Sequence, residues 1–332
     1  MWAAVVAIGL AVAASWLVPI DFNPASRQGQ VTNTAVFVVR VFQFHAGLAC
    51  AAIVPIAWLL RRRRLLVAAL IVSAPILLAE AWRATPSARE VDPNRPTLRV
   101  AAVNLWFRNQ DLDDVEGWLR QLDADVVTFA ELGNHQIELA RRLGDLYPHQ
   151  FPALPRRVSQ AIFSKRPLRA GVYGDGRVSA RVAFDGKPLL VSCVHHRSPG
   201  GVDTVARNFS QASALVREAW LLKRDGLQGV YLGDFNAAEW TPQIQAIQRA
   251  GLTEAHDAAA WGRGPTWPSD PWNGQMFGWH INLIDQLRLG TRIDHVFTTG
   301  GLAATDAGVS PRIGSDHRAV WADLQRTRDA AP

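Results

Sequence analysis

The chain contains little cysteine and little charge. Only Cys50 and Cys193 occur among 332 residues, which excludes a disulfide framework and a zinc cluster built from several cysteines. Charged residues make up 19% of the chain and hydrophobic residues 48%, a balance that is typical of proteins with membrane segments rather than of soluble ones. The length allows one large catalytic domain with an appendage, or two ordinary domains.

A basic stretch is missing from most of the chain, although the net charge is +6. Residues 1–83 contain seven arginines and two acids, which gives +5, and the remaining 249 residues contain 28 basic and 27 acidic residues, which gives +1. The positive charge therefore belongs to the N-terminal part. It does not predict a nucleic-acid-binding face, although a local patch in three dimensions stays open.

Three apolar runs open the chain: Met1–Ile20, Phe42–Leu60 and Leu65–Trp82. A bilayer core of roughly 30 Å needs about 20 apolar residues in a helix, so each run is about long enough. A cleaved signal peptide is the alternative for the first run, but a basic start is missing and two more runs follow. A buried helical hairpin is the alternative for the other two, and the arginines at their turn argue against it.

We therefore predict a membrane anchor of about three transmembrane helices in residues 1–83. Residues 84–97 are rich in proline and charge and predict a linker, and residues 98–332 predict the catalytic domain. Short basic loops stay in the cytoplasm, so Arg61–Arg64 place the second loop and the N-terminus inside. This topology predicts a multi-pass protein of the inner or cell membrane whose catalytic domain is extracytoplasmic and whose partner is the lipid bilayer; no obligatory protein partner is evident.

From Leu98 onward, strand-like and helix-like segments alternate. Helical spacing is found at Asp111–Leu122, 134–143, 202–224 and 241–250. Apolar runs of strand length occur at Leu98–Leu105, Asp125–Ala130, Gln160–Phe163, 177–184, 188–195, Val230–Leu232, Arg292–Phe297 and Ala319–Leu324. Some neighbouring strands are joined by a hairpin turn and others by helices, which predicts a mixed α/β domain.

Polar side chains collect at or just beyond the ends of these strands. They are Asn104, Glu131, His195, Asp234, Asp294 and Asp316. Polar groups at strand ends on a packed α/β scaffold are typical of an active site.

Seven short motifs follow one another in a set order. They are RVAAVNLW, DVVTFAEL, SQAIFSKRPL, LLVSCVHH, VYLGDFNA, RIDHVF and GSDHRAV. In this order and spacing they resemble the endonuclease/exonuclease/phosphatase superfamily with its DNase I-like fold, from about Leu98 to Gln325. The resemblance implies a four-layer α-β-β-α sandwich of two mixed sheets and Mg²⁺- or Mn²⁺-dependent hydrolysis of a phosphate ester.

Oxygen ligands suit such a hard cation. Glu131 is the best candidate metal ligand, Asn104 offers a carbonyl oxygen to the metal or an amide donor to the phosphate, and Asp316 is a further ligand. The alternatives are that Asn104 caps a turn and that Glu131 caps the following helix.

The remaining candidates are catalytic. His317 contacts the scissile phosphate or acts as general base, and Asp294 orients it. The resemblance implies that Asp234 positions or deprotonates the attacking water, that Asn236 stabilises the pentacovalent phosphate, and that His195 protonates the leaving oxygen or binds near it.

His195 and His196 compete for this last role, because side chains alternate along a strand. The match to the family favours His195, although Val194 replaces the threonine that usually precedes that histidine. His295 is expected to be structural, and Arg207 and Gln211, four residues apart on a helix, to be packing and hydrogen-bonding residues.

The loop between Leu252 and Arg292 bears on the substrate. It contains Trp261, Trp267, Trp272, Met276, Phe277 and Trp279. These side chains form either a hydrophobic cap or an aromatic rim that touches lipid or stacks on bases. A lipid or small phosphodiester is favoured, a nuclease stays open, and a catalytically silent membrane-anchored binding or scaffold module is the alternative of another class.

Overall fold

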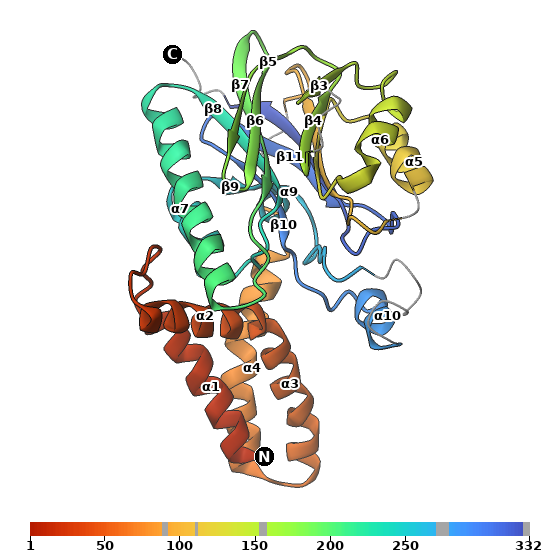
Figure 1. The fold of residues 1–332 in the computed structure, drawn as a ribbon. Coiled ribbons are helices and arrows are strands. Elements are labelled where there is room, and N and C mark those ends of the chain that lie inside the picture. Colours follow the sequence, from red (N-terminus) through yellow and green to blue (C-terminus); the bar gives the residue numbers. More distant parts are fainter. Residues whose placement is uncertain (88–91, 110–111, 153–157, 270–278, 328–332) are drawn as a thin grey trace.

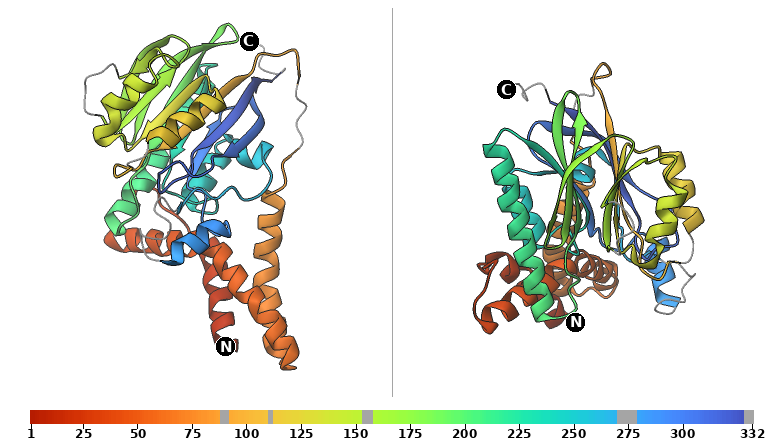
Figure 2. Two further views of the ribbon diagram at one scale, coloured as in Figure 1. Left: turned by 90° about the vertical axis from the view of Figure 1, so that its right-hand side faces the viewer. Right: turned by 45° about the horizontal axis from the view of Figure 1, so that its top comes forward.

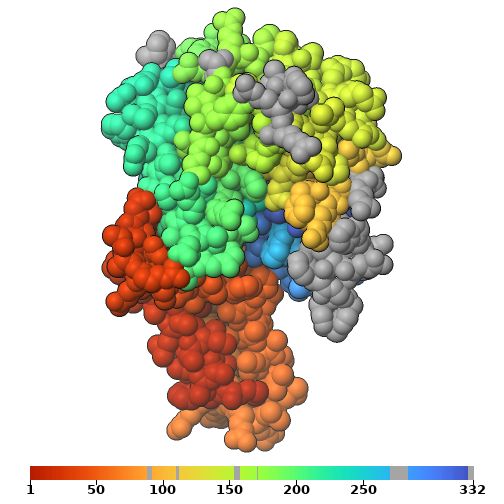
Figure 3. Space-filling view, viewed as in Figure 1, coloured from red at the N-terminus to blue at the C-terminus, as the bar shows by residue number. Residues whose placement is uncertain are grey.

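The computed structural model describes residues 1–87, 92–109, 112–152, 158–269 and 279–327. A stem of helices from the N-terminal residues carries a larger domain built on two sheets (Figure 1). The space-filling view shows the stem as the narrower part, projecting away from the domain (Figure 3).

The stem contains α1 (Trp2–Leu17), α2 (Arg27–Val41), α3 (Gln43–Leu59) and α4 (Arg63–Arg83). Helices α1, α3 and α4 run side by side away from the domain, whereas α2 lies across their domain end (Figures 1 and 2). The expected first loop therefore contains a helix. The Ser26 hydroxyl starts it by accepting a hydrogen bond from the Gly29 amide at 3.1 Å, as an N-cap does.

Among the described helices, α4 alone is long and apolar enough to cross a membrane by itself. Helices α2 and α3 pass the same test only as a pair, bent by 50°, and α1 is apolar but shorter than a span. About three transmembrane helices were expected, and length and composition single out one of the described helices, or two spans if the bent pair is one span. The number of spans stays a prediction.

The first sheet has the strand order β11-β12-β1-β2-β4-β3. Its strands are β1 (Leu98–Asn104), β2 (Val126–Ala130), β3 (His149–Phe151), β4 (Gln160–Ser164), β11 (Leu302–Val309) and β12 (Val320–Arg326). Only β1 and β2 are parallel, so the sheet is mixed.

The second sheet has the order β5-β6-β7-β8-β10-β9, with β7 and β8 as its parallel pair. Its strands are β5 (Leu168–Gly174), β6 (Arg177–Phe184), β7 (Lys187–His195), β8 (Gln228–Asp234), β9 (Thr253–Glu254) and β10 (Asp294–Thr298). The predicted hairpin is the β6–β7 pair.

Helices cover the outer face of each sheet (Figure 2). The domain contains α5 (Leu112–Leu122), the 3₁₀ turn η1 (Gly133–His135), α6 (Gln136–Arg142), α7 (Val202–Arg224), α8 (Pro242–Arg249), α9 (Ala255–Ala259) and α10 (Trp279–Gln286). Of these, α5 and α6 cover the first sheet, and α7 and α8 cover the second. One buried cluster lies between the sheets, a second joins the first sheet to α5 and α6, and a third joins the second sheet to α7 and α8. The expected four-layer arrangement with two mixed sheets is confirmed.

Strand β1 shows why its sequence is apolar throughout. Val100 and Ala102 face the cluster between the sheets, whereas Ala101 and Val103 face the helices. A strand buried on both faces loses the polar alternation that marks a half-exposed one.

Candidate active site

Residues from both sheets meet at one edge of the sandwich. Asn104 ends β1, Glu131 directly follows β2, His195 ends β7 and Asp234 ends β8. Parallel neighbours end at the same edge, so each parallel pair delivers two of these side chains together. Asp294 opens the antiparallel strand β10 and lies opposite Asp234 in register. The strand-end pattern of the sequence thus becomes a single cluster.

Asn104 links the acids of the two sheets. Its side-chain nitrogen donates to Glu131 Oε1 at 3.3 Å and to Asp234 Oδ2 at 3.1 Å, while its side-chain oxygen accepts from the Trp106 amide at 2.9 Å. In this arrangement the nitrogen faces the carboxylates. Coordination of a metal through the oxygen requires a half turn of the amide.

Glu131 is held in a strained backbone conformation, with φ at +55°. Such values are rare outside glycine and concentrate at functional sites. Burial raises the pKa of the Glu131 carboxyl, but the hydrogen bond from His195 and the charges of His195 and His317 outweigh burial and lower that pKa to about 2. Glu131 is therefore ionised at neutral pH and available to a cation.

The neighbouring residues His195 and His196 have different surroundings in the structure. His195 Nε2 lies 3.5 Å from Glu131 Oε1 and 3.9 Å from Asp234 Oδ2. The His196 ring is buried against Phe235, neither of its nitrogens has a hydrogen-bond partner in the described part of the chain, and burial lowers its pKa to about 3. His195 is thus the histidine that faces the acids, as the family match favoured.

Asp234 and Asn236 form a tight unit at the end of β8. The Asn236 backbone and side-chain nitrogens donate to the two Asp234 oxygens at 2.7 and 2.8 Å. Burial raises the pKa of Asp234 to about 6. The preceding Gly233 has φ at +139°, and a Cβ atom there would lie 2.1 Å from the Val194 carbonyl oxygen, so only glycine allows β8 to approach β7 at this point.

Asp294 and His317 form the second predicted pair. His317 Nδ1 bonds Asp294 Oδ2 at 2.8 Å, and His317 Nε2 lies 4.0 Å from Asp234 Oδ2. Burial lowers the pKa of His317, but the negative charges of Asp294 and Asp234 outweigh burial and raise that pKa well above its usual range. The ring is thus oriented by one acid and faces another.

In the described part of the chain, two groups of donor atoms could hold a metal ion, each with its atoms within 4.8 Å of one another: Glu131, His195 and Asp234, and Asp234, Asp294 and His317. Asp316, a predicted ligand, belongs to neither group, but its buried Oδ1 has no hydrogen-bond partner in the described part of the chain. Burial raises the pKa of Asp316 to about 6. A donor set of carboxylate oxygens with one such orphaned oxygen fits a hard divalent cation.

Ser315 and Thr266 hold this cluster in place, and sequence reasoning gave Ser315 no role. The Ser315 hydroxyl donates to the Asn104 carbonyl oxygen at 2.7 Å and accepts from the His317 amide at 3.0 Å. The Thr266 hydroxyl accepts from the amides of Ile293 and Asp294 at 3.0 and 3.2 Å. Ser315 lies inside the GSDH motif, so a signal was present, but the motif does not tell which groups its hydroxyl contacts.

Replacing Ser315 with alanine is expected to lower kcat for phosphodiester hydrolysis by roughly 5- to 100-fold, because a buried acceptor left unpaired costs about 1–3 kcal/mol. The Ser192→Ala variant is the control, since that buried hydroxyl bonds Ser179 within the second sheet. Turnover of bis-p-nitrophenyl phosphate by the two full-length variants checks this. Equal losses in both would contradict a positioning role for Ser315.

The residues expected to be structural have such contacts. His295 is fully buried and bonds the Ala237 carbonyl oxygen at 3.0 Å. Gln211 accepts from the Arg197 amide at 2.7 Å, and Arg207 pairs with Asp175 at 2.9 Å. Gln211 thus supports the loop that follows β7.

The tryptophan-rich loop is only partly described. Trp261 is 76% exposed and Trp267 is 37% exposed. Trp272, Met276 and Phe277 lie outside the described residues, as does the side chain of Trp279.

Comparisons with known proteins agree with this geometry. Residues 101–317 match the model of the Endonuclease/Exonuclease/phosphatase family. Similar solved structures include an endonuclease/exonuclease/phosphatase from Beutenbergia cavernae (20% identity, TM-score 0.52, 70% of this chain and 72% of that one). They also include a Staphylococcus aureus beta toxin mutant with bound magnesium ions (16%, 0.53, 70% and 100%) and truncated Caenorhabditis elegans TDP2 (14%, 0.54, 69% and 97%). No curated protein matches the chain.

Proposed function

Because this chain belongs to the endonuclease/exonuclease/phosphatase family, we propose that it is a Mg²⁺- or Mn²⁺-dependent phosphoric ester hydrolase that works at a membrane surface. The observation that carries the proposal is the meeting of both sheets' acids and histidines at one edge. Asp234 belongs to both groups of possible metal ligands. The groups that could transfer protons and those that could bind a cation therefore lie side by side.

Glu131 and Asp316, with the oxygen of Asn104, would hold the metal. Glu131 supplies a carboxylate that is ionised at neutral pH, and Asp316 supplies a buried oxygen with no protein partner in the described residues. When bound, a divalent cation neutralises charge on the phosphoryl oxygens and activates water.

Different side chains of the protein transfer protons, stabilise charge and bind the phosphate. With a pKa of about 6, Asp234 accepts a proton from water near neutral pH. Asn236 stabilises the charge that develops on the phosphate once its side-chain nitrogen, which donates to Asp234 and to the His196 carbonyl oxygen, gives up one of these bonds. His317, oriented by Asp294, binds the phosphate as a cation, and His195 gives the leaving oxygen a proton.

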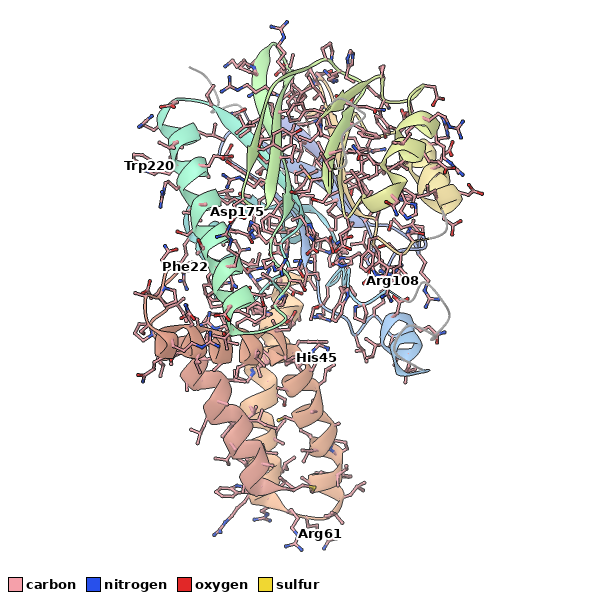
Figure 4. All side chains as sticks on the ribbon, in the orientation of Figure 1. Phe22, His45, Arg61, Arg108, Asp175 and Trp220 are labelled. Atoms are coloured by element: carbon pink, nitrogen blue, oxygen red, sulfur yellow. The ribbon has the colours of Figure 1, made fainter. Side chains whose placement is uncertain are left out.

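The stem supports a location at the membrane. Arg61 lies at the free end of the stem, as the N-terminus does, while the domain lies at the other end (Figures 1 and 4). If the basic loop stays in the cytoplasm, the domain lies outside it, in a multi-pass protein of the cell membrane. The substrate is then a lipid, a small phosphodiester or a nucleic acid that reaches this surface.

A substrate panel tests the proposal. The full-length protein is purified in detergent and given nucleic acids, phospholipids, sugar phosphates and bis-p-nitrophenyl phosphate, with Mg²⁺ or Mn²⁺. We expect metal-dependent hydrolysis of at least one phosphodiester, and its loss in an Asp234→Asn variant. If no member of the panel is hydrolysed, the chain is a silent membrane-anchored module.

A further inference from the structure

The stem and the domain are joined by a buried polar contact at the end of α4. Glu80 is 4% exposed and accepts hydrogen bonds from the Trp240 indole and from Arg263, the latter at 3.3 Å. One turn later, Arg83 pairs with Asp257 and donates to the Glu239 carbonyl oxygen at 3.2 Å. A buried ion pair demands fixed geometry, so this is not the contact of a domain on a loose tether.

Helix α3 adds to the same contact. The Arg263 guanidinium lies 3.5 Å from the centre of the Phe44 ring, and the His45 ring is 2.6 Å from the Leu289 carbonyl oxygen. The predicted linker is also bound to the domain on the N-terminal side of its undescribed part, where the Gly262 amide donates to the Ala84 carbonyl oxygen at 2.9 Å. The orientation of the domain on the stem is therefore fixed.

The domain side of this contact consists of the loops that carry the active site. Trp240 lies four residues after Asn236, and Leu289 lies five residues before Asp294. Arg292, which is 2% exposed, pairs with the same Asp257 that binds the stem. The stem therefore meets the sandwich at the edge that bears the catalytic cluster.

A third site loop reaches the stem through α2. Helix α7 begins seven residues after His195, and in its first turn Asp203 pairs with Arg27 of α2. The Phe22 ring packs edge-on against Phe209 of α7 at 5.2 Å. In Figure 1 the start of α7 rests beside α2, and Figure 4 places Phe22 there.

Two exposed tryptophans lie close to the contact between the stem and the domain. Trp82 at the end of α4 is 83% exposed, and Trp261, next to the Gly262 that binds Ala84, is 76% exposed. Exposed tryptophan concentrates where a membrane meets water. If the stem spans a bilayer, the catalytic edge lies at the height of the lipid head groups.

We infer that the substrate of this site is a membrane lipid with a phosphodiester head group, taken from the leaflet at the domain end of the stem. This inference rests on the proposed hydrolase function. The phosphate of a lipid head group in that leaflet lies next to the catalytic edge. A nucleic acid has to enter between this edge and the lipid surface, and the domain's charge of nearly zero offers it no electrostatic attraction.

The test loosens the contact without touching the cluster. The Glu80→Ala/Arg83→Ala double variant removes one acid and one base, so the net charge stays the same. Glu116→Ala/Arg120→Ala is the matched control, because that pair lies on the far helix α5. Each full-length protein is reconstituted in nanodiscs of phosphatidylcholine and phosphatidylglycerol with Mg²⁺ or Mn²⁺, and lipid hydrolysis is compared with that of dissolved bis-p-nitrophenyl phosphate.

The wild-type and control proteins should hydrolyse both substrates. The double variant should hydrolyse bilayer lipid about tenfold or more slowly, since misplacing a substrate by about 1 Å can lower the rate 100-fold. It should keep its rate on the dissolved diester. It should also keep its rate on the same lipids in detergent micelles, which approach from any direction. If the wild type hydrolyses the dissolved diester but not bilayer lipid, the inference is overturned. It is also overturned if the double variant loses the same factor in rate on both substrates. No hydrolysis of either substrate overturns the proposed function itself.

Discussion

Replacing His317 with alanine is expected to lower kcat for phosphodiester hydrolysis by about 100- to 1,000-fold, the range that loss of one group stabilising the transition-state charge costs. The ring is 5% exposed, bonded to Asp294 and 4.0 Å from Asp234. Its removal leaves Asp294 buried without its cationic partner. Both the contact to the phosphate and the local charge balance are then lost.

Turnover of bis-p-nitrophenyl phosphate at saturating metal measures this loss. His149→Ala is the control, because His149 lies in the edge strand β3, away from the acids. The control should keep the wild-type rate. A His317→Ala variant that is folded and within about tenfold of the wild-type rate would show that this histidine does not bind the phosphate as assigned.

The second large effect concerns metal affinity. The Glu131→Gln change keeps the size of the side chain but removes the charge of the proposed ligand and one of its two acceptor oxygens. We expect the metal concentration for half-maximal activity to rise by about 100-fold or more, because even residues behind a metal ligand contribute 10- to 100-fold. Activity should return in part at high metal concentration.

Initial rates across a Mn²⁺ titration check this effect. Glu138→Gln is the matched control, since Glu138 lies on α6 and pairs with Arg142. An unchanged metal dependence in Glu131→Gln, with a lower rate at every concentration, would assign Glu131 to catalysis and leave the metal to other residues.

The sequence predicted that these polar side chains lie at strand ends because the signals for this are local. Asn104, Glu131 and Asp234 each follow or end a buried strand, and parallel pairing brings such positions together. The choice between His195 and His196 rested on a family match, and the structure supplies the physical reason. His195 meets two acids, whereas His196 packs on Phe235.

Other parts of the fold had weak local signals. Strand β11 has the sequence LAATDAGV, in which alanine, aspartate and glycine disfavour strands, and its pairing with β12 along the edge of the sheet holds it in place. Strand β9 is only two residues long. Tertiary pairing decides such segments, so periodicity could not find them.

The joint between stem and domain could not be predicted for a different reason. Glu80 and Trp240 are 160 residues apart, and Arg83 and Asp257 are 174 apart. In the sequence, Glu80 is the only charged residue of the apolar run Leu65–Trp82. No periodic pattern indicates its distant partners. The prediction of a simple linker after Arg83 therefore missed that the chain binds the domain as soon as the helix ends.

The most direct test of the central claim is the initial rate of bis-p-nitrophenyl phosphate hydrolysis by the full-length protein, measured as purified, after chelation and after metal is added back. If acids and histidines at this edge form a metal-dependent phosphoesterase site, activity disappears on chelation, returns with Mg²⁺ or Mn²⁺, and does not return in the Asp234→Asn variant. Hydrolysis that persists after complete chelation, or that returns equally in Asp234→Asn, would contradict the claim.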